Sequence, residues 1–269
     1  MLASFIIVFR EVLEAGLIVG IVLAATVGIR GRGRYLAAGI AAGIAGACLL
    51  AGSIDLLATA LAGNGQDIFT VAILVLAVLM LGWHTIWMSR HGREIARQMQ
   101  TLGGAVKDGQ RTLFAMAVVV AIAVLREGAE VVLFLYGIAI SAKLGAAALI
   151  GGGLAGVAGG VAVAWLLYRG LLAIPLHRLF GVTSWLIALL AAGMAGQAAA
   201  LLASDDLIPA FGNQVWNTSW LLSTASLPGK ALQALIGYSD RPMGVQIAVY
   251  VATLAILILA ARRTARAGG

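Results

Sequence analysis

Two apolar stretches of this sequence each contain three charged residues in the same order. The stretches FREVLEAGLIVG and LREGAEVVLFLYG both carry the pattern R-E-x-x-E, which supplies Arg10, Glu11, Glu14, Arg126, Glu127 and Glu130. On a helix, carboxylates at this spacing project from one face. An ionisable side chain inside a membrane costs at least about 2.5–3.5 kcal/mol, so such residues persist where structure or function needs them. The motifs therefore mark a buried functional site.

The charge of the two motifs points to a cation. Four glutamates carry four negative charges, and Arg10 and Arg126 offset two of them. The excess needs protons or a bound cation when it is removed from water. Carboxylate oxygens suit Mg²⁺, Ca²⁺, Mn²⁺ or iron, particularly Fe³⁺, rather than Cu⁺. The alternative is that each arginine only neutralises the glutamate four residues later, but each motif then leaves one glutamate over.

Composition places these motifs in a membrane protein. The chain has 269 residues, of which 62% are hydrophobic and 11% charged, well outside the usual range for soluble domains. Stretches without Asp, Glu, Lys or Arg cover 35–54, 68–89, 144–168, 179–204 and 242–261, each long enough to cross the hydrocarbon layer. The net charge of +7 comes from basic residues between the apolar stretches, so we expect a lipid surface and no nucleic acid as the partner.

The spacing of the basic clusters predicts an all-α integral membrane protein with seven transmembrane helices. The expected spans are 2–28, 35–61, 68–89, 113–141, 146–168, 179–203 and 244–261. Of 18 basic residues, 13 fall in alternate connections and at the C-terminus, which the positive-inside rule assigns to the cytoplasm. We therefore expect the N-terminus outside and the C-terminus in the cytoplasm. The basic connection 90–112 predicts a short surface helix or a solvated loop, and the outer segment 204–243 is expected to be interfacial or re-entrant.

The two motifs also predict an internal repeat. All three matched positions are offset by 116 residues, which indicates two units of three helices with a seventh helix appended. Units with an odd number of spans enter the membrane in opposite directions, giving a 3+3 inverted repeat with substrate bound between the halves. In a single membrane domain, 1–269, we expect repeat one at 1–112, repeat two at 113–203, the outer loop at 204–243 and the seventh helix at 244–261. Glu11 should then share a level with Glu130, and Glu14 with Glu127.

Over its whole length, the chain resembles the oxidase-dependent iron transporters: the high-affinity iron permeases of fungi and the iron-uptake permeases of bacterial inner membranes. The resemblance rests on both motifs, the seven spans, the pair Gly196-Gln197 and the stretch from Trp216 to Ser219, with Asn217 where family members often have Asp. It implies a multi-pass inner-membrane permease that is not an enzyme and holds no permanent cofactor. It further implies import of Fe³⁺, produced from Fe²⁺ by an extracytoplasmic oxidase or supplied by an iron-delivery protein. The glutamates of both motifs would bind the ion, and copies of the chain could associate.

Other residues are secondary candidates. Asp55 is expected near the outer end of its helix, as an interfacial residue or a metal-entry ligand, and Asp205 and Asp206 could attract cations at the outer mouth. Gln197 could donate to a glutamate across the bundle or serve helix packing. His84 stands beside Trp83 near the end of a span, and its position favours an interfacial belt residue over an exit ligand or proton acceptor.

Three alternatives to an iron permease stay open. The same carboxylates suit a manganese or magnesium transporter, or a proton-coupled cation carrier. A membrane di-metal oxidoreductase is less favoured, because its usual E-x-x-H ligands are missing from both motifs. A seven-helix light sensor is disfavoured by the absence of lysine from 244–261, where a retinal would attach.

Overall fold

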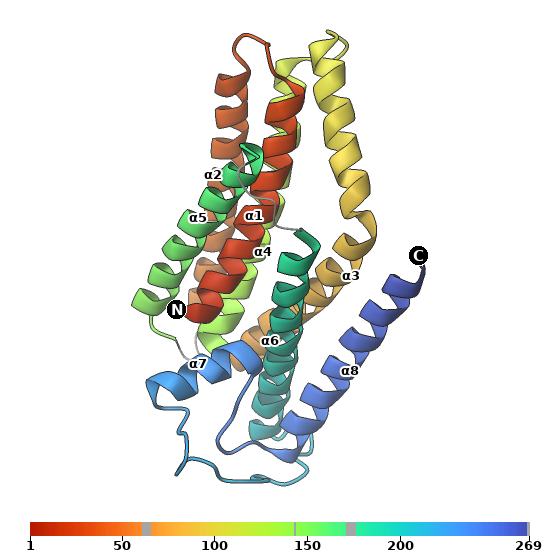
Figure 1. Cartoon of the computed structure of the whole chain (residues 1–269). Helices are drawn as coiled ribbons and strands as arrows, with labels where there is room; N and C mark the ends of the chain where they lie inside the picture. The colour runs from red at the N-terminus through yellow and green to blue at the C-terminus, as the bar shows by residue number, and fades with distance from the viewer. Residues whose placement is uncertain (61–65, 143, 171–175, 268–269) are drawn as a thin grey trace.

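The computed structural model describes residues 1–60, 66–142, 144–170 and 176–267, all of whose regular elements are α-helices (Figure 1). They are α1 (Leu2–Ala25), α2 (Arg32–Ala60), α3 (Gln66–Lys107), α4 (Leu113–Ser141), α5 (Ala146–Tyr168), α6 (Leu176–Ser204), α7 (Leu227–Ile236) and α8 (Gly244–Ala267). The all-helical prediction is confirmed.

Two helix pairs form one half of the molecule. α5 packs lengthwise on α1, and α2 packs lengthwise on α4. Glycines make both contacts close: a Cβ at Gly156 would lie 2.8 Å from the carbonyl oxygen of Phe5, and a Cβ at Gly43 would lie 2.7 Å from the Cβ of Val124. Small residues permit this approach of two backbones in a membrane protein. A Cβ at Gly39, Gly152 or Gly160 would likewise lie within 3 Å of an atom of the neighbouring helix.

The other half contains α3, α6 and α8. α3 packs on α6, α6 packs on α8, and α1 and α4 both contact α3. The main apolar cluster brings together buried residues of α1, α3, α4 and α6, among them Ile7, Leu74, Phe134 and Ile187. A second apolar cluster, including Val22, Leu36 and Val120, joins the opposite ends of α1 and α4. The segments of α1 and α4 between these clusters carry the two charged motifs.

α3 is longer than expected. The sequence predicts a span over 68–89 and a separate surface helix in 90–112, whereas one helix continues from Gln66 to Lys107 and changes direction along its length (Figure 1). No proline or glycine pair interrupts the chain between the two predicted segments, so the backbone has no local reason to leave the helix there. Val106, near its end, is buried in the second apolar cluster.

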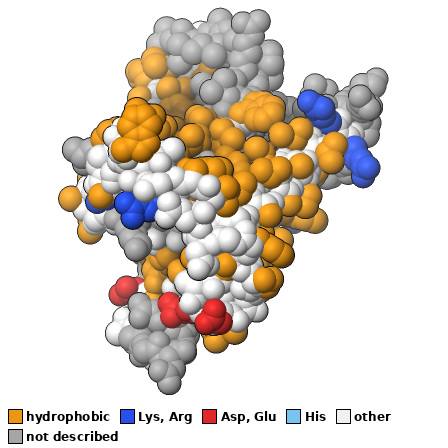
Figure 2. Space-filling view, turned by 90° about the horizontal axis from the view of Figure 1, so that it is seen from below, with side chains coloured by type: hydrophobic (Ala, Val, Ile, Leu, Met, Phe, Trp, Pro, Cys, Tyr) orange, Lys and Arg blue, Asp and Glu red, His pale blue; other side chains and the backbone are white. Residues whose placement is uncertain are grey.

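The segment after α6 contains the short helix α7, which lies across the end of the bundle where the N-terminus is found (Figure 1). The hydroxyl of Ser226 caps α7 by accepting from the backbone N–H of Gly229 at 3.1 Å, and Gly237 ends it with a φ of 70°. The side-chain amide of Gln233 donates to the carbonyl of Ser141 on α4 at 3.0 Å. Figure 2 views this end of the molecule, where hydrophobic side chains cover much of the visible surface.

Among the residues that the structure describes, four helical segments are long and apolar enough to cross a membrane: Arg32–Ala60, Asp67–His84, Ala146–Tyr168 and Thr183–Ser204. α1 and α4 are equally long but carry the charged motifs, and α8 contributes a shorter apolar stretch over Gly244–Ala260. The two helices that carry the charged motifs, α1 and α4, contact each other.

Candidate metal centre

The two motifs meet in the interior of the bundle. Arg10, Glu11 and Glu14 lie on α1, and Glu127 and Glu130 lie on α4. All five residues are buried, with Glu11 at 0% exposure, although each belongs to a residue type that is rarely buried without a partner. Apolar clusters lie on both sides of this charged layer along α1 and α4. The layer is therefore shielded from water in both directions along the bundle.

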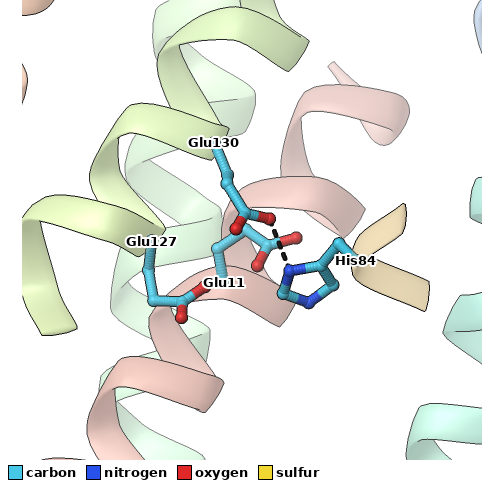
Figure 3. Close-up of side chains that lie close together, drawn as sticks. All are labelled: Glu11, His84, Glu127 and Glu130. Atoms are coloured by element: carbon cyan, nitrogen blue, oxygen red, sulfur yellow. Dashed lines mark ion pairs between the residues drawn. The ribbon is translucent and has the colours of Figure 1, made fainter. Parts of the chain in front are cut away.

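His84 joins the two motifs. It projects from α3 between the carboxylates and is 2% exposed (Figure 3). Its Nε2 lies 3.1 Å from Oε2 of Glu14, and its Nδ1 lies 2.6 Å from Oε2 of Glu130. The second glutamate of each motif therefore contacts a different nitrogen of one imidazole.

The same two glutamates are also held by arginines of their own helices. Nε of Arg10 lies 3.0 Å from Oε1 of Glu14, and Nε of Arg126 lies 3.4 Å from Oε1 of Glu130. Both are the i, i+4 pairs that the sequence indicates. The side chain of Arg10 is 3% exposed, whereas that of Arg126 is 37% exposed. The two motifs thus have matching contacts in unequal surroundings.

The first glutamate of each motif is less engaged. Oε1 of Glu11 lies 3.4 Å from Arg10, and Oε1 of Glu127 lies 3.9 Å from Arg126. The remaining oxygen of each, Oε2, is buried and has no hydrogen-bond partner among the described residues. A buried carboxylate oxygen without a donor is costly, and a bound cation would relieve that cost.

Four of these side chains have the arrangement of a metal site. Ligand atoms of Glu11, His84, Glu127 and Glu130 all lie within 4.8 Å of one another, and all four residues are buried. Figure 3 shows them converging from three helices. The expected proximity of Glu11 and Glu130 is confirmed, whereas Glu14 lies outside this group and contacts the far nitrogen of His84.

The interpretation of His84 as an interfacial belt residue is wrong. Its neighbour Trp83 is 70% exposed, but His84 continues the buried stripe of Leu74, Ala77 and Leu81 along α3. This spacing of three and four residues was the signal in the sequence that could have found it. The prediction weighed His84 by its distance from the end of the span rather than by its helix face.

The accessory candidates lie elsewhere. Asp55 is exposed on α2, and Asp205 and Asp206 are exposed directly after α6. Gln197 lines a small polar pocket between α4, α6, α7 and α8, together with Ser141, Gln233, Tyr238 and Gln246. Asn217 forms a local turn, in which its side-chain oxygen accepts from the backbone N–H of Ser219 at 3.1 Å and from its hydroxyl at 2.6 Å. None of these residues belongs to the described group of four.

Comparison with known proteins decides the family. The iron permease FTR1 family matches residues 1–264. The chain belongs to this family. Among curated relatives of the permease, the ferrous iron permease EfeU of Shigella sonnei is 31% identical over 273 residues, which cover 100% of this chain and 98% of the relative. The ferrous iron permease EfeU of Yersinia pestis is 30% identical over 274 residues, covering 98% and 96%. No solved structure matches the chain.

Family membership confirms several predictions made from the sequence. The chain is an iron permease, a multi-pass membrane protein and a transporter rather than an enzyme. Iron is its substrate.

Proposed function

We propose that this permease imports iron across the membrane through the buried group of Glu11, His84, Glu127 and Glu130, with Glu14 as a further glutamate of the site. The observation that carries the proposal is the convergence of four buried ligand atoms from α1, α3 and α4 within 4.8 Å. Two of these residues have a carboxylate oxygen without a partner. Three carboxylates and an imidazole suit iron among the first-row metals.

The residues of the site have different roles in this proposal. Glu11 and Glu127 present their unpartnered oxygens to the ion. Arg10 and Arg126 hold Glu14 and Glu130 ionised while the site is empty, and the imidazole of His84 contacts both carboxylates and orients them. The arriving ion then competes with the two arginines for the same carboxylates, so a contact broken on binding is available to reform on release.

The proposed architecture has seven spans in a 3+3 inverted repeat, with the N-terminus outside and the C-terminus in the cytoplasm. The repeats are 1–112 and 113–203, followed by the outer segment 204–243 and the last helix. The packing supports this proposal, because the first helix of each repeat packs on the second helix of the other: α1 on α5 and α4 on α2. The third helices, α3 and α6, pack on each other. Asp205 and Asp206 attract cations to the outer mouth in this arrangement.

The oxidation state of the transported ion has two candidates. The family resemblance implies Fe³⁺, made from Fe²⁺ by a partner oxidase outside the membrane. Two observations favour Fe²⁺: His84 adds a nitrogen to what would otherwise be an oxygen-only site, and four glutamates with two arginines leave a net charge of −2. The relatives also bear the name ferrous iron permease. Mn²⁺ is the alternative divalent substrate.

Uptake of radioactive iron by iron-starved cells tests the proposal. Wild type is compared with Glu127→Gln, with iron given as Fe²⁺ in the presence and absence of an oxidase, and with Mn²⁺ as the competitor. Uptake that requires Glu127 supports the site, and normal uptake by an inserted Glu127→Gln protein contradicts it. Dependence on the oxidase selects Fe³⁺, whereas uptake under reducing conditions selects Fe²⁺. Inhibition by Mn²⁺ selects a general divalent carrier.

A further inference from the structure

A large groove separates the two helix pairs. It has a volume of about 700 Å³ and lies between α1 and α5 on one side and α2 and α4 on the other. Along α1 it extends from Val8 to Leu23, which corresponds to about 22 Å of helix. Apart from Glu11 and Glu127, its lining is almost entirely apolar.

The walls of the groove belong to helices that face the membrane. α2 and α5 are both long and apolar enough to span it. Ile44 on α2 and Val161 and Trp165 on α5 line the groove and are 53%, 56% and 51% exposed. A polar occupant would find few hydrogen-bond partners on these walls, whereas hydrocarbon would bury them. The chemistry of the lining selects an acyl chain.

Two guanidinium groups flank the end of the groove away from the glutamates. Leu23 and Tyr168 line this end. Arg32 donates to the backbone carbonyl of Leu23 at 3.0 Å, and the guanidinium of Arg169 lies 5.1 Å from the ring centroid of Trp165. Basic residues beside the end of an apolar groove fit an anionic headgroup, because the phosphate binds the guanidinium while the tail stays in hydrocarbon.

We infer that this groove is a binding site for an anionic phospholipid. One acyl chain lies between the helix pairs, and the headgroup phosphate contacts Arg32 and Arg169. The tail reaches the level of Glu11 and Glu127 and excludes water from these carboxylates on that side. Lipid binding stands independently of the proposed iron transport; only this last consequence rests on it.

Gly20 provides a substitution that fills the groove. Gly20 lines it, and the nearest atoms to an added Cβ, both on Tyr168, would be 4.0 Å away, so Gly20→Leu places its side chain in the groove without a clash at the backbone. Gly52→Leu is the matched control. Gly52 is an exposed helical glycine outside the lining, and a Cβ there would meet nothing within 4 Å.

The test is native mass spectrometry of the full chain released from bilayers of phosphatidylethanolamine and phosphatidylglycerol. We expect wild type and Gly52→Leu to retain one phosphatidylglycerol and Gly20→Leu to lose it. The double variant Arg32→Gln, Arg169→Gln should keep a lipid but no longer prefer phosphatidylglycerol. Absence of retained lipid from wild type, or equal retention by Gly20→Leu with normal thermal unfolding, would overturn the inference.

Cys48 offers a second readout of lipid binding that does not depend on a substitution that fills the groove. It is the single cysteine of the chain, is exposed and lines the groove. Added phosphatidylglycerol should slow the reaction of Cys48 with N-ethylmaleimide in detergent. A Cys48→Ala, Leu49→Cys variant moves the thiol to a position that is 74% exposed and outside the groove, and its reaction should not change. Equal slowing of both thiols would mean general coating by lipid and would contradict a site.

Discussion

Nδ1 of His84 lies 2.6 Å from Oε2 of Glu130, a contact that joins α3 to α4 inside the membrane domain. Because Nε2 of the same ring lies 3.1 Å from Glu14 on α1, one imidazole connects the second glutamates of both motifs. The relative positions of α1 and α4 at the site therefore depend on a residue that belongs to neither motif.

Replacing His84 should impair transport while leaving the motifs intact. Loss of a group that orients metal ligands typically lowers affinity or activity by about 10–100-fold. We expect a loss of iron uptake in this range for His84→Ala and a smaller loss for His84→Gln, which retains a donor. Trp83→Phe is the control, since Trp83 is the neighbour of His84 in the chain and its own side chain is 70% exposed. Equal uptake by His84→Ala and Trp83→Phe would exclude a role for the imidazole.

The two arginines should differ in their effect on stability. Arg10 is 3% exposed and faces two glutamates, so Arg10→Gln leaves buried carboxylates without their cation. Breaking such a buried pair costs about 3–5 kcal/mol. Arg126 is 37% exposed, so solvent screens its pairs and Arg126→Gln should cost less. Thermal unfolding in detergent measures the difference, and a larger loss for Arg126→Gln would contradict this asymmetry.

Close packing of α1 on α5 should be sensitive to one methyl group. A Cβ at Gly156 would lie 2.8 Å from the carbonyl oxygen of Phe5 and 2.9 Å from the backbone nitrogen of Phe9. We expect Gly156→Ala to lower the free energy of unfolding by about 1–3 kcal/mol, as overpacking does. Gly52→Ala, in open space on α2, should be neutral or stabilising by less than about 1 kcal/mol. Comparable unfolding of the two variants would argue against tight packing of α1 on α5.

The donor set should determine which metals compete. His84→Asp replaces the only nitrogen of the four-residue group with oxygen, which favours harder ions. We expect Mn²⁺ to inhibit uptake of Fe²⁺ more strongly in this variant, by a factor on the order of ten in the inhibitory concentration, equivalent to about 1.4 kcal/mol. Competition curves in reconstituted vesicles measure the change. An unchanged curve would place His84 outside the coordination of the ion.

The sequence predicted much of this structure because charges inside apolar helices are conspicuous. Glu11, Glu127 and Glu130 could be found this way. His84 could not be placed by its type, since a histidine beside a tryptophan fits a membrane interface as well as an interior. Only its helical spacing from Leu81 distinguishes the two locations.

The lengths of the helices were harder to predict from the sequence than their positions. The sequence contains no proline near the boundary between the predicted span 68–89 and the basic segment 90–112, so polarity alone suggested a boundary that the backbone of α3 does not have. The unequal burial of Arg10 and Arg126 could not be predicted from the sequence either, because identical motifs carry no information about their different neighbours in the folded bundle.

Equilibrium binding of radioactive Fe²⁺ to the purified permease tests most directly whether iron binds among these glutamates. Wild type should bind one ion per chain at its single described group of ligands. The double variant Glu11→Gln, Glu127→Gln should bind at least about tenfold more weakly, a loss of about 1.4 kcal/mol or more. Asp55→Asn, exposed on α2, should match wild type. Unchanged affinity in the folded double variant would contradict the proposed site.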